Sequence, residues 1–184
     1  MKTLFRTLIP LFFVLAILGS SRKAHALGPI GIEAGAQVGV GTNPDSAGPN
    51  PLGVGLGLRG GVVLFGGLYG GVKIMDYLGG TEDGVKVHSL QEGVDVGWGF
   101  KVLLLTIRPQ IGIGNVSSTA SVDGISASSN SLYLEPGVTA LISLGLLYIG
   151  ADANYLYITS ASQGDGTSKG EGGVTIHGQI GVQF

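Results

Sequence analysis

The chain has 184 residues, a formal net charge of −2 at pH 7, no cysteine and 35 glycines. The absence of cysteine excludes disulfides and the usual cysteine-modified lipoprotein anchor. Ten basic residues against 12 acidic ones give no electrostatic footprint for nucleic acid, and the glycines lack the three-residue period that collagen requires.

The first 26 residues have the features of a secretory signal peptide. A basic start is followed by an apolar run over 8–18, and the segment ends in Ala-His-Ala at 24–26. Eleven apolar residues are fewer than the roughly 20 that a membrane-spanning helix needs, and Ala-x-Ala is a typical cleavage site. We therefore predict cleavage after Ala26. An uncleaved anchor is the alternative, because Arg22 and Lys23 lie close to the cut.

Removal of this segment would leave 184 − 26 = 158 residues, which is the length of one domain, 27–184. That domain has 6 basic and 12 acidic residues, a formal charge of 6 − 12 = −6, and holds 34 of the 35 glycines. These glycines alternate with Val, Ile and Leu, which is unlike a flexible Gly/Ser linker.

The domain contains eight segments with the alternation expected of strands. In the clearest, 30–41, the even positions are aliphatic or alanine, and the odd positions hold glycine, Glu33 and Gln37. Side chains alternate across a strand with a period of two, so this pattern predicts one apolar and one polar face. The predicted strands cover 30–41, 52–62, 68–78, 86–100, 105–116, 132–142, 147–157 and 172–184.

The connections alternate between long polar loops and short turns. Polar loops follow the first, third, fifth and seventh strands, and 117–131 and 159–171 are rich in Ser and Gly. Strands of about 9–11 residues span a bilayer, and the sheet must close because lipid cannot satisfy a free edge. We predict an all-β fold, an eight-stranded antiparallel up-and-down transmembrane β-barrel with its termini on the periplasmic side.

The apolar face is predicted to meet lipid. A soluble barrel of the lipocalin kind would instead carry frequent Lys and Glu on its outer face, whereas the polar face here is mainly glycine and fits a narrow interior. Aromatic residues near the strand ends predict a girdle at each membrane interface. One girdle would hold Tyr77, Tyr133, Tyr155 and Tyr157 beside the loops, and the other Phe65, Phe100, Tyr148 and Phe184 beside the turns.

The signal peptide, the rhythm of strands and loops, and the alternating segment 172–184 resemble those of small eight-stranded outer-membrane barrels of Gram-negative bacteria, the OmpA/OmpX type. In these families the barrel-assembly machinery recognises a C-terminal strand with a final Phe. The resemblance implies an assembly signal at Ile180, Val182 and Phe184, from which Gly178 departs. It also implies a porin-like monomer in the bacterial cell outer membrane, contacting membrane lipid and lipopolysaccharide, without the peptidoglycan-binding domain of longer OmpA-like proteins.

Eight charged residues are predicted to face the lumen: Glu33, Arg59, Lys73, Asp95, Lys101, Arg108, Glu135 and Asp152. Burying a charge is costly unless it is paired, so we expect ion pairs and hydrogen bonds among them. An eight-stranded barrel is only just wide enough to be filled by side chains, which predicts a filled lumen. The alternative is a narrow channel for ions or small apolar solutes, through space that the glycines leave for water.

The remaining motifs favour neither catalysis nor cofactor binding. Residues 55–60 satisfy G-x-G-x-x-G but lie within a predicted strand, whereas nucleotide binding needs a strand-to-helix turn. Neither His88 nor His177 has a serine beside it on the same face, and no His–carboxylate cluster has metal-ligand spacing. We predict a non-enzymatic barrel with a structural or surface-interaction role and no cofactor or metal. Adhesion through the loops is weakly supported, because they lack aromatic anchors.

Overall fold

The computed structural model describes residues 30–43, 50–65, 67–82, 84–122, 125–159 and 171–184. The predicted signal peptide and most of the predicted loop 159–171 lie outside these residues. The described strands are β1 (Ile30–Thr42), β2 (Val54–Leu64), β3 (Leu68–Glu82), β4 (Val85–Trp98), β5 (Phe100–Val102), β6 (Leu105–Val122), β7 (Ile125–Leu144), β8 (Leu147–Ile158) and β9 (Glu171–Gln183). Within these ranges no helix is long and apolar enough to cross a membrane.

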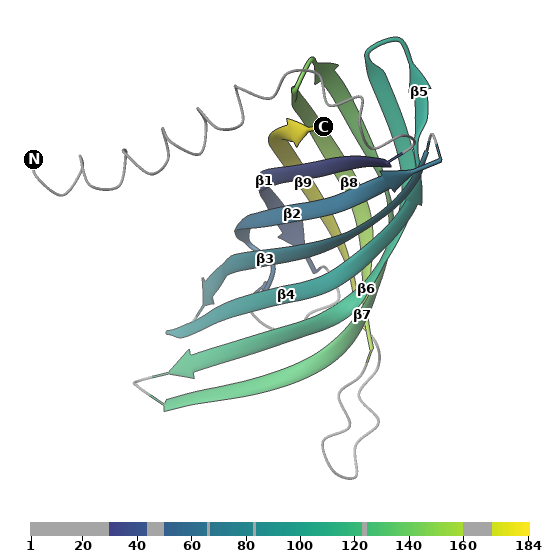
Figure 1. Cartoon of the computed structure of the whole chain (residues 1–184). Helices are drawn as coiled ribbons and strands as arrows, with labels where there is room; N and C mark the ends of the chain where they lie inside the picture. The colour runs from purple at the N-terminus through teal and green to yellow at the C-terminus, as the bar shows by residue number, and fades with distance from the viewer. Residues whose placement is uncertain (1–29, 44–49, 66, 83, 123–124, 160–170) are drawn as a thin grey trace, which may run out of the picture.

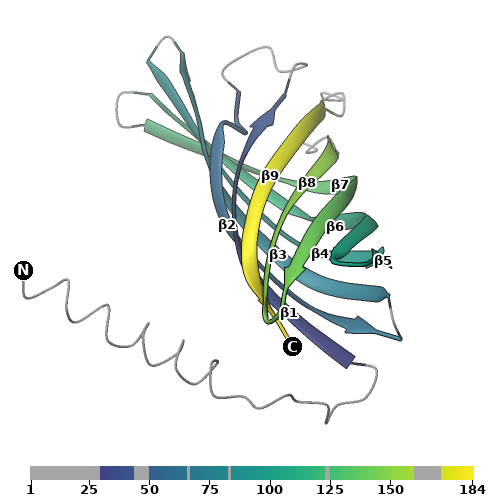
Figure 2. The ribbon, with the colours of Figure 1, turned by 90° about the horizontal axis from the view of Figure 1, so that it is seen from above.

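The strands close into one antiparallel barrel. Strands that are neighbours in the chain pair with each other, except that β4 and β5 both pair with β6. β9 pairs with β1, so the sheet has no open side. Only Gly99 separates β4 from the short β5. The two segments act as one strand of the barrel wall, so the barrel is eight-stranded. Figures 1 and 2 show the tilted strands surrounding a common axis. The predicted fold is confirmed.

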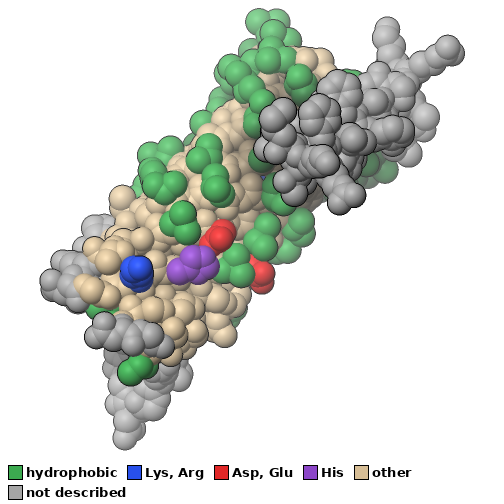
Figure 3. Space-filling model, turned by 90° about the vertical axis from the view of Figure 1, so that its left-hand side faces the viewer, with side chains coloured by type: hydrophobic (Ala, Val, Ile, Leu, Met, Phe, Trp, Pro, Cys, Tyr) green, Lys and Arg blue, Asp and Glu red, His purple; other side chains and the backbone are tan. Residues whose placement is uncertain are grey.

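Alternation along each strand separates a buried lumen from an apolar outer surface. Leu58 and Ile176 point outward and are 62% and 54% exposed, whereas the adjacent Arg59 and His177 are 6% and 1% exposed. Figure 3 shows one side of the outer surface, where hydrophobic side chains are spread along the barrel and charged ones gather toward one end. An outer face of this kind suits lipid and not water, as the sequence predicted.

The two ends of the barrel differ in their connections. At one end, called here the turn end, the chain reverses at 65–67, 103–104 and 145–146, and it also carries the start of β1 and the end of β9. Phe65 (φ 47°) and Leu103 (φ 56°) adopt the left-handed conformation that such tight reversals require. The opposite end, called the loop end, carries two long connections, 43–53 and 159–170, and two short ones, 83–84 and 123–124.

The prediction of a loop over 117–131 was wrong. β6 and β7 continue as a regular hairpin up to a connection at 123–124, with an unbroken register from Leu105 opposite Ile142 to Val122 opposite Ile125. Hydroxyl side chains face each other across its outward face, and its inward face mixes Ser with Ala, Val122 and Ile125. The segment therefore lacks the apolar alternation of a half-buried strand. β3 likewise continues to Glu82, into the predicted turn 79–84, and β4 begins directly after it at Val85. Figure 1 shows β3, β4, β6 and β7 reaching beyond the other strands.

The girdle prediction was correct for some aromatic residues and wrong for others. The outward residues are Tyr155, Tyr157, Phe65, Phe100 and Phe184, which are all at least 40% exposed. Tyr77, Tyr133 and Tyr148 are at most 2% exposed and point into the lumen. Their position near a strand end suggested an interface role, but their parity along the strand decides which face they occupy.

Candidate functional site

The lumen is built from glycines on some strands and large side chains on their neighbours. The Tyr133 hydroxyl lies where a Cβ on Gly93 would be, and the Tyr148 hydroxyl does the same at Gly35. Met75 lies over Gly57 in the same way. The glycines therefore make room for side chains that reach across from adjacent strands, which is how an aromatic ring protects a glycine in a sheet.

At the turn end, an arginine–glutamate pair crosses the lumen. Arg108 on β6 donates from Nη1 and Nη2 to the Glu33 carboxylate on β1, at 2.9 and 2.7 Å. The guanidinium carbon also lies 4.0 Å from the centroid of the Tyr69 ring. A bidentate pair with planar stacking is the strongest arrangement available to a buried guanidinium, so this pair ties opposite walls of the barrel together.

Arg59 occupies the next layer. Its Nε donates to the Tyr69 hydroxyl (3.0 Å), Nη1 to Thr139 Oγ1 (3.1 Å) and Nη2 to Gln110 Oε1 (2.5 Å). Asp95 Oδ2 lies 3.6 Å from Nη2. Arg59 thus joins four different strands, and its charge faces a carboxylate that is itself only 2% exposed.

Closer to the loop end, Lys73 pairs with Glu135. The lysine Nζ contacts Glu135 Oε2, and the two side chains are 3% and 1% exposed. Glu135 also accepts from Gln91 Nε2 and Thr175 Oγ1, each at 3.0 Å. The carboxylate therefore has partners on three strands, which meets the requirement that a buried ion pair satisfy its remaining lone pairs.

The fourth carboxylate, Asp152, is held by a histidine and three amides. His177 Nδ1 lies 2.7 Å from Asp152 Oδ1, and Asn154 Nδ2 donates to the same oxygen at 2.6 Å. Gln37 and Gln179 donate to Oδ2 at 3.0 and 3.4 Å. The other histidine nitrogen, Nε2, lies 2.7 Å from the Tyr77 hydroxyl. This is an Asp–His–Tyr chain, and it is buried.

An apolar cluster lies above these polar layers at the loop end. Its members are at most 2% exposed and come from four strands and the segment before β2: Leu52, Met75, Tyr77, Val116, Tyr133 and Leu156. Leu52 was predicted to face lipid as the first residue of a strand. The strand instead begins at Val54, and the Asn50 side chain folds the preceding segment inward by donating to Gly41 O (2.8 Å) and accepting from Leu52 N (3.0 Å).

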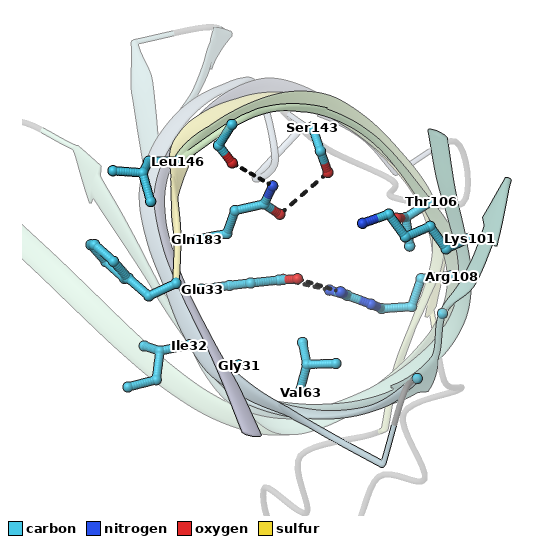
Figure 4. A pocket seen from close by; sticks show the side chains of 14 residues that line it. Gly31, Ile32, Glu33, Val63, Lys101, Thr106, Arg108, Ser143, Leu146 and Gln183 are labelled. Carbon is cyan, nitrogen blue, oxygen red and sulfur yellow. Dashed lines mark hydrogen bonds and ion pairs between the residues drawn. The ribbon is translucent and has the colours of Figure 1, made fainter. Parts of the chain in front are cut away.

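The turn end opens into a vestibule of about 380 Å³. Figure 4 shows the Glu33–Arg108 pair crossing its floor, with Ser143, Gln183 and Lys101 around the rim. Ser143 Oγ donates to Gln183 Oε1 at 3.4 Å, and Gln183 Nε2 donates to Gly145 O at 3.2 Å. The vestibule is therefore lined by both polar and apolar residues, among them Val63 and Leu146, and is closed inward by an ion pair.

The structure brings together seven of the eight charged residues predicted to face the lumen. Six of them are at most 6% exposed, and the Glu33 side chain is 12% exposed. Lys101 does not join them, because it is exposed at the vestibule rim and forms no ion pair within the described ranges. Sequence reasoning also missed the neutral members of this network, which carry no charge signal: Gln37, Gln91, Gln110, Thr139, Asn154, Thr175 and His177.

The three residues of the expected assembly signal lie on β9 and after it, on the outer surface. Ile180 and Phe184 are 59% and 40% exposed, and Val182 is partly exposed. Phe184 N donates to Ile32 O (2.9 Å) and Phe184 O accepts from Ile32 N (3.1 Å), so this residue lies on the seam that closes the barrel.

No protein-family model matches the sequence, and neither does any curated protein. Several solved structures are similar to the chain in fold. Neisserial surface protein A has a TM-score of 0.67 at 12% identity, over 85% of this chain and 98% of that one. The N-terminal β-barrel domain of OprF from Pseudomonas aeruginosa gives 0.60 at 12%, over 84% and 97%. Ail, the attachment invasion locus protein of Yersinia pestis, gives 0.52 at 16%, over 84% and 97%.

At these identities the likeness concerns the fold. The closed eight-stranded meander, the aliphatic outer surface and the polar lumen are also typical of outer-membrane barrels. The chain has the fold of the small eight-stranded outer-membrane β-barrels.

Proposed function

We propose that this protein is a structural or surface-interaction barrel of the outer membrane whose lumen is filled by side chains and does not conduct. The apolar cluster around Leu52 carries the proposal, because it covers the loop end of the lumen with side chains that are at most 2% exposed. Below it, three cations (Arg59, Lys73 and Arg108) face carboxylates at short range. An ion crossing the barrel would have to displace both layers.

A catalytic role has little support from either histidine. His88 lies on the outer face, where Nε2 is 2.5 Å from Asp76 Oδ1. His177 has its two nitrogens occupied by Asp152 and Tyr77 and is 1% exposed. Across the described part of the chain no hydrogen bond joins a histidine to a serine, so the pairing that activates a serine nucleophile is missing there.

Conductance measurements test the sealed lumen. The refolded protein is expected to give no stable unitary currents in planar bilayers at neutral pH, because the apolar cluster and the paired charges both block the axis. Folding of the same sample is checked on SDS gels, where a closed barrel resists SDS and changes mobility on boiling. Stable unitary currents from gel-verified, folded protein would reject the sealed lumen and favour a narrow channel for ions or small apolar solutes.

We further propose that the outward residues at the end of β9 are the signal read by the barrel-assembly machinery, with the turn end in the periplasm. Phe184→Ser should lower the amount of heat-modifiable barrel in the outer membrane several-fold. Gln183→Ser is the matched control, because that side chain points into the vestibule and should leave assembly unchanged. Equal loss in both variants would indicate a general effect on β9 and argue against an outward signal.

The protruding sheet of β3, β4, β6 and β7 supports the surface-interaction part of the proposal. It places an exposed, polar and regular surface beyond the apolar band at the loop end. Ail, one of the structurally similar barrels, is an attachment invasion locus protein. In the present chain the loop end, with its protruding strands, is the region available for contacts outside the cell.

A further inference from the structure

The outward side of the β6–β7 hairpin carries an uncharged polar surface, called here the hydroxyl face. Its six residues come from alternate positions on two paired strands: Ser117, Thr119, Ser121, Ser126, Ser128 and Asn130. Ser117 lies opposite Asn130, and the other four form two cross-strand pairs. Thr119 Oγ1 is 3.0 Å from Ser128 Oγ, and Ser121 Oγ is 2.9 Å from Ser126 Oγ.

The hydroxyl face is the direct continuation of the lipid-facing surface. On β6 the same parity includes Ile111 and Ile113, which are 48% and 55% exposed, and on β7 it includes Leu132 and Leu134, at 61% and 40%. The register has no shift between these residues and the end of the hairpin. The side chains just beyond the aliphatic band therefore point in the same direction as the band, toward the surrounding membrane.

The length of the hairpin sets how far this surface reaches. The last aliphatic residue of this face, Leu132, lies opposite Asn115, and six residues separate Asn115 from Ser121. At roughly 3.3 Å per residue they make about 20 Å of strand. With a tilt of about 35–45° the end of the face lies about 15 Å above Leu132. The hydroxyl face therefore spans the whole head-group layer of the leaflet and does not end at its boundary with the hydrocarbon.

Charge distinguishes this face from the neighbouring strands. On β3 and β4 the outward positions at the same level include three charged or titratable groups, Asp76, His88 and Lys86. Leu90 lies opposite Ser117, and Glu92 lies one rung lower, opposite Asn115. Lys86 lies opposite Ser121 and His88 opposite Thr119. The hydroxyl face itself has no charged member, so it matches a partner rich in neutral hydroxyl groups, with one cation at its flank. A head group made only of phosphate would fit Arg and Lys far better.

We propose that the hydroxyl face binds the sugar head groups of glycolipids in the leaflet at the loop end. Hydroxyl and amide side chains on a flat, regular strand pair can each donate and accept, which is what the hydroxyls of a sugar require. The neighbouring apolar band holds the acyl chains of the same lipid. The inference rests on the proposed membrane function, and it adds the lipid class and the residues that contact it.

The test compares two triple variants on opposite faces of one hairpin. The outward variant is Ser117→Ala, Ser121→Ala and Ser128→Ala, with one change in each rung of the hydroxyl face. The matched inward variant is Ser118→Ala, Ser129→Ala and Ser131→Ala, which removes the same number of hydroxyl groups from the other face. Each protein is folded into phosphatidylcholine vesicles, alone or with lipopolysaccharide that carries core sugars or has been stripped to lipid A. The readout is the urea midpoint of unfolding.

Core-sugar lipopolysaccharide is expected to raise the midpoint of the wild type and the inward variant above that with lipid A. The outward variant should lose most of this increment. Equal increments in all three proteins would overturn the proposal, as would an equal increase from lipid A, which would point to phosphate. The phosphatidylcholine midpoint reports any effect on the hairpin itself. A wild-type protein that fails to insert into phosphatidylcholine vesicles would contradict the proposed membrane function. That result is distinct from equal increments in all three proteins, which would contradict only glycolipid binding.

Discussion

Replacing Glu135 by leucine should lower the free energy of unfolding by about 3–5 kcal/mol, the usual cost of leaving a buried charge without its partner. The Lys73 and Glu135 side chains are 3% and 1% exposed, so water cannot solvate the lysine once the carboxylate is gone. Gln91 and Thr175 would lose their acceptor in the same step. The measurement is urea unfolding in phospholipid vesicles, followed by the fluorescence of Trp98, the single tryptophan.

Two further variants separate charge from packing. The double variant Lys73→Met with Glu135→Leu should recover most of the loss, because no unpaired charge remains and the side chains are of similar size. Glu92→Leu is the matched control, since this glutamate is on the outer face and exposed, and it should change stability by less than about 0.5 kcal/mol. If Glu135→Leu alone costs as little as Glu92→Leu, the charge of Lys73 can be neutralised by water or another group. The side chains around Lys73 would then be less tightly packed than their exposed fractions indicate.

The fold was predictable because period-two alternation is a local signal. Each strand shows it independently, and the same rule assigns Arg59, Asp95 and Arg108 to one face without knowledge of neighbouring strands. A one-residue slip would reverse every side chain, so the assignment of faces is robust wherever one face is aliphatic. The signal failed on the β6–β7 hairpin because neither face is apolar there, and a Ser-rich strand has the composition of a loop.

The partners within the lumen could not be predicted, because they depend on stagger around the barrel. Arg59 and Lys73 lie directly opposite each other on β2 and β3, yet one faces Asp95 and the other Glu135. Parity gives the face of a residue but not its height relative to distant strands. Arg108 and Glu33 are 75 residues apart in the chain and meet only through the tilt and shear of a closed sheet.

Glycine provides the sharpest test of how the lumen wall is built, because two glycines should respond in opposite directions. A Cβ on Gly114 would overlap the carbonyl oxygen of Glu92 and lie 2.5 Å from the Cα of Gly93, and both are backbone atoms that cannot rotate away. Gly114→Ala should therefore cost about 3 kcal/mol or more, or prevent folding. A Cβ on Gly70 would meet nothing within 4 Å, so Gly70→Ala should be neutral or stabilising by about 0.4–1 kcal/mol.

The two variants are compared by the fraction of heat-modifiable barrel and by the urea midpoint. Gly70 is on the outer face, opposite Val62, and serves as the control, whereas Gly114 is in the lumen wall. The result at Gly114 bears on the choice between a filled lumen and a narrow channel, because the two models assign different roles to the lumen glycines. Glycines that accept tyrosine, methionine and asparagine side chains from neighbouring strands leave no path. Glycines that leave room for water would tolerate a methyl group. If Gly114→Ala folds with an unchanged midpoint, the wall has more space than the contacts of Tyr133 with Gly93 and Gly114 allow, and the channel becomes the better account.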